Sequence, residues 1–312
     1  MTATASVASP DTSLETAPGN SRLPWFAFGH LDVKVTTGLV IVGIFVVLAV
    51  VGPVLAPYNP SAGSGPDLAP PSWSHLLGTT QTGQDVLSEL LVGTRATLIV
   101  GFVAGAISVL LAVLVGVTAG YMGGVGDELL SLLSNVFLVI PALPLVIVLA
   151  GYIKGAGTLD VAVVIAVTGW AFGARVLRAQ TLSIRERDFV VAAHMRGEKL
   201  WRLVLLEVLP NEQALVLSAF LLTSVFAVLT QASLAFLGVG SISTWSWGTM
   251  LYWAQNAEAF TIGAWWWYVP PGLCIALFGT SLGLLNFALD QQLNPKLRVL
   301  ARRRRIAGET RA

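Results

Sequence analysis

Six runs of mainly apolar residues, each long enough to cross a bilayer as a helix, constrain this chain more than any other feature. A transmembrane helix needs about 20 apolar residues to span roughly 30 Å of hydrocarbon. The runs cover residues 35–56, 96–120, 129–151, 159–176, 214–237 and 267–289. The stretch Leu39–Leu48 lacks the alternation of apolar and polar residues found in barrel strands, so we expect helices to satisfy its backbone groups. The predicted fold class is an all-α membrane protein with six spans.

The composition agrees with a membrane protein and excludes several other classes. Of the 312 residues, 55% are hydrophobic and 11% are charged, and the mean hydropathy of +0.76 lies above the range of soluble domains. The single cysteine, Cys274, lies in an apolar run and excludes an internal disulfide. His30, His75 and His194 lack the spacing of metal ligands. We therefore expect no metal site and no redox chemistry, and the net charge of +1 does not suggest a nucleic-acid partner.

The distribution of basic residues predicts the orientation in the membrane. If both termini lie on one side, sixteen of the eighteen Lys and Arg residues flank the spans on that side, with seven in 175–202 and seven in 296–311. The opposite loops, 57–94 and 238–266, contain neither Lys nor Arg. Because basic residues stay on the cytoplasmic side, we expect a multi-pass protein of a bacterial-type plasma (inner) membrane with both termini in the cytoplasm.

The near absence of charge from the spans bears on the class of membrane protein. Ion-coupled carriers place ionisable residues at membrane depth, whereas Asp160 and Asp290 lie at span ends and Glu207 and Glu212 fall in the cytoplasmic segment after the fourth span. The chain also lacks the Gly-x-x-x-x-Gly-Lys-[Ser/Thr] loop that cradles nucleotide phosphates. Both absences favour a separate ATPase over an ion-coupled carrier. A membrane enzyme is disfavoured because no catalytic cluster is visible, and a scaffold or channel requires that no ATPase binds.

The segment between the fourth and fifth spans carries the most informative pattern. Ser183 and Glu186 are spaced as a capping box, and Gly197 is placed to end a short helix in the left-handed conformation. An apolar stripe follows before Pro210, made by Leu200, Leu203, Val204 and Val208. We therefore predict two short cytoplasmic helices. From these residues alone, a connector packed on the bundle and a helix docked in another protein's groove are equally favoured.

Several stretches of the chain also follow, in order and spacing, the motifs of one known family. They are Val191-Ala192-Ala193 with Gly197 and Leu209-Pro210-Asn211, together with His75–Leu87, Gly120–Gly124, Asp127–Leu130, Pro141, Ser233–Gly240, Ser246–Leu251 and Asn294–Leu297. The chain thereby resembles the dipeptide, oligopeptide and nickel permeases of ATP-binding-cassette (ABC) importers. The resemblance covers residues from about 30 to 298 and points to the second of two paired permease subunits.

This resemblance implies a type I ABC-importer transmembrane domain of six spans with cytoplasmic coupling helices. It implies a homologous second permease subunit, two ATPase subunits that bind ATP and Mg²⁺, and an extracellular binding protein, with membrane lipid around the spans. This chain would form half of the gate and carry no catalytic site and no cofactor of its own. The predicted ATPase-coupling residues are Phe189, Val191, Ala192, Ala193, Arg196, Gly197, Glu198, Leu209, Pro210 and Asn211. The outer-loop family motif corresponds to Gly78, Thr79, Gly83 and Asp85.

Two positions depart from the family pattern. Val191 stands where the loop usually has an acidic residue, and Gln84 stands where an Arg is expected before Asp85. The first departure concerns one salt bridge to the ATPase that the resemblance implies. Three charged residues lie near enough in the sequence to replace it electrostatically, namely Asp188, Arg196 and Glu198.

The predicted docking surface on the coupling loop is therefore defined mainly by shape. Ala192 and Ala193 are small enough to let a short helix seat closely on its partner, and Phe189 is suited to fill a pocket. We expect steric changes at the alanines to affect coupling more than a change of charge at Val191.

The sequence leaves the substrate open. The family carries peptides, nickel complexes and, in some members, oligosaccharides, and peptide is the default expectation. Six tryptophans gather towards the second outer loop and the start of the last span: Trp245, Trp247, Trp253, Trp265, Trp266 and Trp267. They fit an aromatic belt and a docking surface for the binding protein better than a platform for sugar rings.

The predicted organisation has three parts. Residues 1–30 form a disordered cytoplasmic tail that is rich in Ala, Ser, Thr and Pro and unlike a signal peptide. Residues 31–298 form the permease domain, with a cytoplasmic coupling loop at 178–212 between the two outer loops. Residues 299–312 form a basic cytoplasmic tail.

The orientation is testable by site-directed labelling with an impermeant reagent. Labels near Ser61 and Ser243 should react from outside intact cells, whereas labels near Glu198 and at the C-terminus should react only after permeabilisation, because the basic residues gather on the cytoplasmic side. Reaction near Glu198 in intact cells would overturn the orientation.

Overall fold

A computed structural model describes residues 33–153 and 157–293 of the chain, and helices dominate both ranges. The long helical stretches are α1 (Val33–Leu55), α2 (Val86–Ala112) continued by the π-helical turn η1 (Val113–Val117) and α3 (Thr118–Met122), α4 (Gly124–Val139), α5 (Ala142–Tyr152), α6 (Thr158–Arg185), α9 (Leu209–Phe236) and α11 (Trp265–Leu293). Shorter elements are α7 (Asp188–Met195), α8 (Leu200–Arg202), the π-helical turn η2 (Leu203–Val208) and α10 (Trp247–Asn256). Five stretches can each cross a membrane, and the bent pair α4–α5 gives a sixth when counted as one span. The all-α membrane fold is confirmed.

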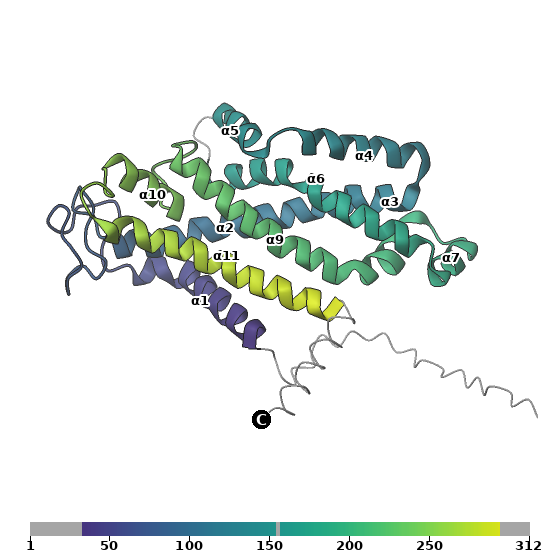
Figure 1. Cartoon of the computed structure of the whole chain (residues 1–312), viewed down its shortest axis with the longest axis horizontal. Helices are drawn as coiled ribbons and strands as arrows, with labels where there is room; N and C mark the ends of the chain where they lie inside the picture. The colour runs from purple at the N-terminus through teal and green to yellow at the C-terminus, as the bar shows by residue number, and fades with distance from the viewer. Residues whose placement is uncertain (1–32, 154–156, 294–312) are drawn as a thin grey trace, which may run out of the picture. The chain divides into compact units, whose positions relative to one another are not determined.

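Helix α2, with η1 and α3, packs closely against both α6 and α9 (Figure 1). Two pairs of glycines four residues apart make this possible, since Gly101 and Gly105 face α9 whereas Gly116 and Gly120 face α6. A Cβ atom added at Gly116 would lie only 2.3 Å from the carbonyl oxygen of Ala174. Small residues let helix backbones approach in a membrane, so these glycines set the distances at the centre of the bundle.

Helix α6 continues beyond residue 176, where the apolar run of the fourth predicted span ends, as far as Arg185. One face of this extension is buried at a spacing of three or four residues, by Ala174, Leu177, Thr181 and Ile184. That spacing is helical, so the buried face continues the helix although its other face is charged. Arg175 and Arg178, counted in the sequence among the cytoplasmic residues, therefore lie inside α6.

Two more spans begin earlier than their apolar runs. Helix α2 begins at Val86 because Asp85 caps it, with the Ser88 backbone N–H donating to Asp85 Oδ2 over 2.8 Å. The fifth span begins at Leu200, because α8, η2 and α9 form one helical stretch.

The third predicted span is sharply bent. Helices α4 and α5 meet at an angle of 89° across Ile140 and Pro141, where Pro141 precedes the first residue of α5. Pro141 accounts for this bend, since proline cannot continue the hydrogen bonding of the preceding helix. Helix α11, by contrast, continues through Pro270 and Pro271.

Polar contacts join the helices near the end that carries α7. The Arg178 guanidinium donates to both carboxylate oxygens of Asp127, with Nη2 lying 2.6 Å from Oδ2, and so ties α6 to α4. The Thr181 hydroxyl donates to Glu212 Oε1 over 2.7 Å and ties α6 to α9. Glu212, which the sequence placed in the cytoplasmic segment, is only 1% exposed and belongs to the helix bundle.

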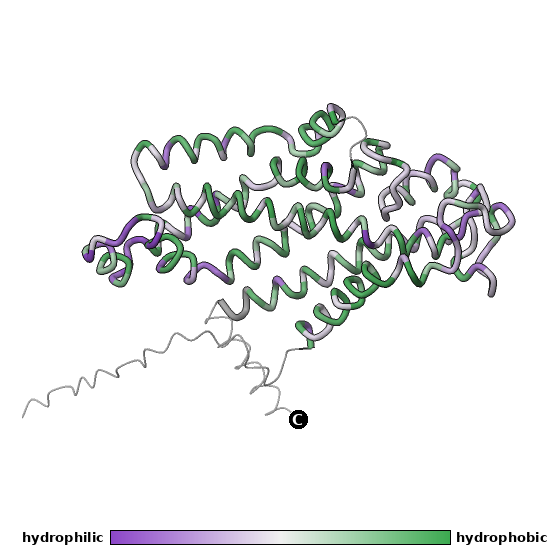
Figure 2. The backbone as a smooth tube through the Cα atoms, turned by 180° about the vertical axis from the view of Figure 1, so that it is seen from behind, coloured by the Kyte–Doolittle hydropathy of each residue, from purple (hydrophilic) through white to green (hydrophobic). Residues whose placement is uncertain are grey.

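Hydrophilic residues gather at the two ends of the described helices (Figure 2). One polar region surrounds α7, and the other comprises residues 57–85 and the segment next to α10. Between them the helices expose many apolar side chains, as expected for surfaces that contact lipid or another membrane protein. We refer to the two polar regions as the α7 end and the α10 end.

The close approach of α2 to α6 predicts a steric requirement at Gly116. Gly116→Ala should lower the free energy of unfolding by about 1–3 kcal/mol, because the methyl group overlaps the Ala174 backbone. The matched control is Gly43→Ala in α1, where nothing lies within 4 Å of an added Cβ, and this change should alter stability by about 1 kcal/mol or less. Unfolding of the purified protein in detergent measures both, and equal effects would contradict the packing described.

Candidate functional site

The loop at the α7 end contains one short helix, α7, which is followed by a glycine cap. Helix α7 spans eight residues, and the Gly197 backbone N–H donates to the carbonyl oxygen of His194 over 2.9 Å. Gly197 has φ +77°, so the predicted left-handed cap is confirmed. The predicted capping box is wrong, because Ser183 lies within α6 and Arg187 precedes α7 without a side-chain cap.

Helix α7 has one buried face and one exposed face. Val190 and Ala193, three residues apart, are 1% and 0% exposed and pack in a cluster of the chain's own residues that includes Leu203. Phe189 and Val191 are 38% and 40% exposed. The prediction that both alanines of the loop seat against a partner is therefore wrong for Ala193, which anchors α7 to its own chain.

Ala192 lies on the exposed side of α7 with Phe189 and Val191. These three residues form what we call the α7 outer face. Arg196 and Gly197 are also exposed where the helix ends. The face is thus a small apolar surface with a basic residue at its border, and it is available to a partner.

The second predicted short helix is instead the beginning of a long one. The π-helical turn η2 precedes Leu209, and the helix passes through Pro210 into the span. Proline lacks a backbone donor and clashes with the carbonyl four residues earlier, and a π-helical turn widens the helix at that point. Pro210 and Asn211 are exposed, and Asn211 Nδ2 donates to the carbonyl oxygen of Glu207 over 2.6 Å.

Glu198, one of the acidic residues near the missing carboxylate, already has a partner within the chain. Its Oε2 lies 3.3 Å from Nη1 of Arg202, one helical turn away. Both side chains are partly exposed, so the pair contributes little to stability. Asp188 and Arg196 remain exposed near the α7 outer face.

A large apolar cavity lies on one side of the bundle between the α4–α5 bend, α6 and α9. Its volume is about 500 Å³, and its walls include Phe137, Pro141, Phe172, Leu222 and Phe226. Ligand pockets of proteins commonly have volumes of this order. Apart from Pro141, these residues carry no pattern in the sequence that marks a site, because they belong to faces of three separate helices that only the fold brings together.

The outer-loop motif holds the start of α2 in place. Asp85 Oδ1 lies 2.9 Å from His75 Nδ1, while Asp85 Oδ2 caps the helix. The Thr79 hydroxyl donates to the carbonyl oxygen of Pro66 over 2.6 Å, and both groups lie within the loop. Gly78 has φ +70° and Gly83 has φ +69°, conformations that favour glycine. The four motif residues thus build a fixed loop at the α10 end.

The six tryptophans do not form one surface. Trp247 and Trp267 are buried, and Trp247 Nε1 donates to the Thr94 hydroxyl over 3.2 Å. The prediction that all six contact a partner or substrate is wrong for these two, which pack inside the chain. The other four are at least partly exposed: Trp245, Trp253, Trp265 and Trp266.

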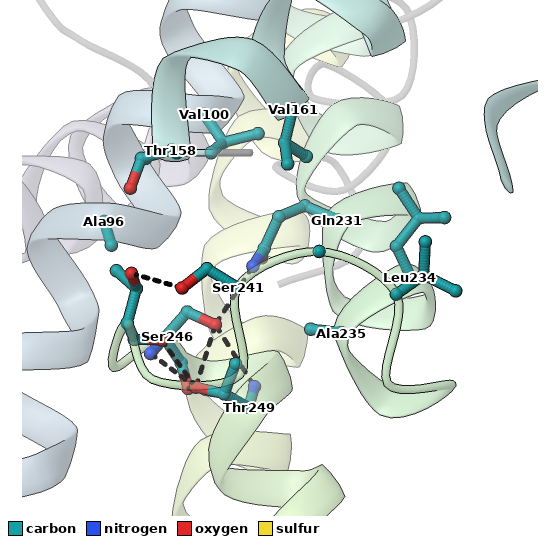
Figure 3. Close-up of a pocket in the computed structure, with 14 residues that line it drawn as sticks. Ala96, Val100, Thr158, Val161, Gln231, Leu234, Ala235, Ser241, Ser246 and Thr249 are labelled. Carbon is teal, nitrogen blue, oxygen red and sulfur yellow. Dashed lines mark hydrogen bonds between the residues drawn. The ribbon is translucent and has the colours of Figure 1, made fainter. Parts of the chain in front are cut away.

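A small cavity of about 40 Å³ lies under the segment before α10 (Figure 3). Gln231 of α9 points towards Ser246, and its Nε2 donates to the Ser246 hydroxyl oxygen over 3.0 Å. Ser246 also caps α10, since its hydroxyl oxygen accepts from the Thr249 backbone N–H over 3.1 Å. This network fastens α10 to the end of α9.

Comparisons with known proteins agree with this architecture. The family described as binding-protein-dependent transport system inner membrane component matches residues 112–299, and the N-terminal transmembrane domain of oligopeptide transport permease C matches residues 35–71. The dipeptide transport system permease protein DppC of Bacillus subtilis is 34% identical over 84% of this chain and 81% of its own length. The oligopeptide transport system permease protein OppC of the same species is 32% identical over 84% and 85% of the two chains. The di/tripeptide transport system permease protein DppC of Pseudomonas aeruginosa is 33% identical over 88% and 91%.

The structure predicts a scaffolding role for Asp85. Asp85→Ala should lower the free energy of unfolding by about 2 kcal/mol, because it removes the α2 cap and leaves His75 without its partner. Asp85→Asn keeps an acceptor at the cap and should cost less, and Asp67→Ala, at an exposed position of the same loop, should have little effect. Thermal unfolding and protease cleavage within residues 57–85 measure the difference. A stability of Asp85→Ala equal to that of Asp67→Ala would exclude this role.

Proposed function

The chain belongs to the family of binding-protein-dependent transport system inner membrane components, and on this premise we propose that it is the permease subunit of an ATP-driven ABC importer of peptides. It spans the membrane repeatedly, as the family does. In the proposed machine it pairs with a homologous second permease subunit, and each of the two lines half of the path. Two ATPase subunits bind ATP and Mg²⁺ on the cytoplasmic side, and an extracellular binding protein delivers the substrate.

One observation carries the proposed link to the ATPases. Helix α7 is a short helix whose buried face, with Val190 and Ala193, packs on the bundle, while Phe189 and Val191 on its other face are exposed. A rigid, partly apolar helix at a polar end of the bundle suits a groove in a soluble partner. We propose that the α7 outer face, with Arg196 and the turn at Gly197, docks to an ATPase.

Transport in this proposal is conformational work. Closure of the two ATPases around ATP displaces α7, and α6 and the stretch from α8 to α9 move with it because α7 connects them. The path then opens outward to accept a peptide from the binding protein, and hydrolysis resets it. We infer that this chain carries no catalytic site and no cofactor of its own.

The apolar cavity beside α6 supports a role as half of a path. It is open on one side and bounded by elements from three parts of the chain. We propose that the second permease subunit faces it and completes the enclosure. Peptide is proposed as substrate over oligosaccharides or nickel complexes because the relatives compared above are named for dipeptide, oligopeptide and di/tripeptide transport.

The orientation and domain limits are part of the same proposal. The α7 end faces the cytoplasm, and the α10 end, with Trp245, Trp253, Trp265 and Trp266, faces the binding protein and the outer membrane interface. Residues 31–298 act as the permease domain. The tails, 1–30 and 299–312, lie in the cytoplasm.

A substitution at Gly197 tests the docking of the ATPases. Nothing lies within 4 Å of a Cβ added there, so Gly197→Val changes the backbone preference without a clash. Because a β-branched residue disfavours φ +77°, the turn after α7 should shift, and the ATPases should co-purify at a fraction of the wild-type amount. Gly197→Asn is the matched control, since Asn tolerates this conformation.

The readouts are co-purification of the ATPases and stimulation of ATP hydrolysis by the peptide-loaded binding protein, measured on the intact assembly. Both should fall in Gly197→Val and persist in Gly197→Asn. Full co-purification and stimulation in Gly197→Val would refute the assignment of this loop to ATPase coupling. A wild-type assembly whose ATPase ignores every peptide offered would refute the proposed substrate class.

A further inference from the structure

Arg175 is a cation within a membrane-spanning helix that lacks an acidic partner in the described part of the chain. It lies ten residues before the end of α6 at Arg185, which corresponds to about 15 Å along the helix axis. Its side chain is exposed, and among residues 33–153 and 157–293 no carboxylate oxygen lies within 4.0 Å of its guanidinium. Arg175 also falls within the apolar run 159–176, and a charge in such a segment is costly and usually faces a cavity and a partner of opposite charge.

The neighbouring arginines of α6 are already engaged. Arg178 donates to both carboxylate oxygens of Asp127. Arg185 donates to the carbonyl oxygen of Gly120 over 3.2 Å. Asp127 is thus committed to Arg178, and Arg175 differs from both neighbours in having no such partner among the described residues.

Arg175 lines a third cavity, of about 120 Å³, between η1, α3, α4 and α6. The hydroxyls of Ser131 and Ser134 in its wall donate to Asp127 and to the carbonyl oxygen of Leu130. Asn135 also lines this cavity and is exposed. The groups left to meet a ligand are therefore the Arg175 guanidinium and the Asn135 amide, which together favour an anion with oxygen acceptors.

The cavity lined by Arg175 and the large apolar cavity are lined by successive turns of the same two helices, α4 and α6. On α4 the lining passes from Asn135 to Leu138, and on α6 it passes from Arg175 to Phe172 and Ala171. A ligand that fits both therefore has an anionic group at one end and bulky, mainly apolar groups next to it. The C-terminal end of a peptide has this form.

We propose that Arg175 binds the C-terminal carboxylate of the transported peptide while the peptide's side chains occupy the apolar cavity beside α6. This inference rests on the proposed function and adds to it a substrate requirement, a free carboxylate. A guanidinium matches a carboxylate through two parallel hydrogen bonds, and Asn135 supplies an amide donor in the lining of the same cavity.

The test compares two substrates in the reconstituted assembly with its binding protein. One is a labelled tripeptide with a free C-terminal carboxylate, and the other is the same tripeptide with a C-terminal amide, in a sequence that the binding protein holds with equal affinity in both forms. Uptake into phosphatidylcholine vesicles, with and without phosphatidylglycerol, is measured for the wild type and for Arg175→Gln, Arg175→Lys and Arg95→Gln. Arg95 is an exposed arginine of α2 that lines neither cavity.

Arg175→Gln should raise the half-saturating concentration of the carboxylate peptide about tenfold and change that of the amide less than twofold. Arg175→Lys keeps the charge but cannot form the two parallel hydrogen bonds of a guanidinium, so it should give an intermediate increase in the half-saturating concentration. This variant replaces Arg175→Gln in the test if the Gln variant fails to assemble. Arg95→Gln should match the wild type with both peptides.

Equal losses with both peptides would overturn the carboxylate site. A loss that occurs only with phosphatidylglycerol present would also overturn it, and would identify a lipid phosphate as the partner of Arg175. A wild type that transports neither peptide refutes the proposed function itself, whereas a wild type that transports both, with no discrimination after Arg175→Gln, refutes only this inference.

Discussion

The close contact of α2 with α6 and α9 is the constraint on which the rest of the bundle depends. Lipid gives no hydrophobic force between helices, so they associate through close packing and polar bonds. Glycine pairs at Gly101 and Gly105 and at Gly116 and Gly120 allow that packing without side chains between the backbones. With α6 held there, Arg178 is placed to bind Asp127, and other residues of α6 form walls of the large apolar cavity and of the cavity lined by Arg175. A loosened α2–α6 contact would therefore disturb the cavities as well as the stability.

The apolar runs predicted the number and order of the spans, because hydrocarbon imposes helix on any run of sufficient length. They did not predict where the helices end. Helix α6 extends beyond its apolar run. In this extension the face with Leu177 and Ile184 is buried and the other face is charged, so the mean hydropathy of the segment is low although it is helical. The second short helix was wrongly predicted for a related reason. Pro210 predicts the end of a helix when only its neighbours in the sequence are considered, whereas the turn η2 accommodates this proline inside a continuous helix.

The sequence predicted the candidate site correctly where the backbone conformation requires a particular residue type. Gly197 was placed correctly because a left-handed turn favours glycine. The side chains around it were harder to assign, since nothing in the sequence says which face of an eight-residue helix meets its own chain, and Ala193 proved to face inward. The large cavity and the isolation of Arg175 depend on long-range packing, and the sequence counted Arg175 only as a topology signal.

The helix that leaves the coupling loop also has a mechanical consequence. It runs from Leu200 to Phe236 as one stretch of 37 residues, which corresponds to about 55 Å. A rod of that length acts as a lever, so a tilt of about 5° around its middle carries each tip by about 2.4 Å in opposite directions. Near one tip, Leu203 packs in the same cluster as Val190 of α7, and near the other, Gln231 donates a hydrogen bond to Ser246 at the start of α10. A displacement of the helix end near α7 would thus produce a displacement of equal size and opposite direction at the end near α10.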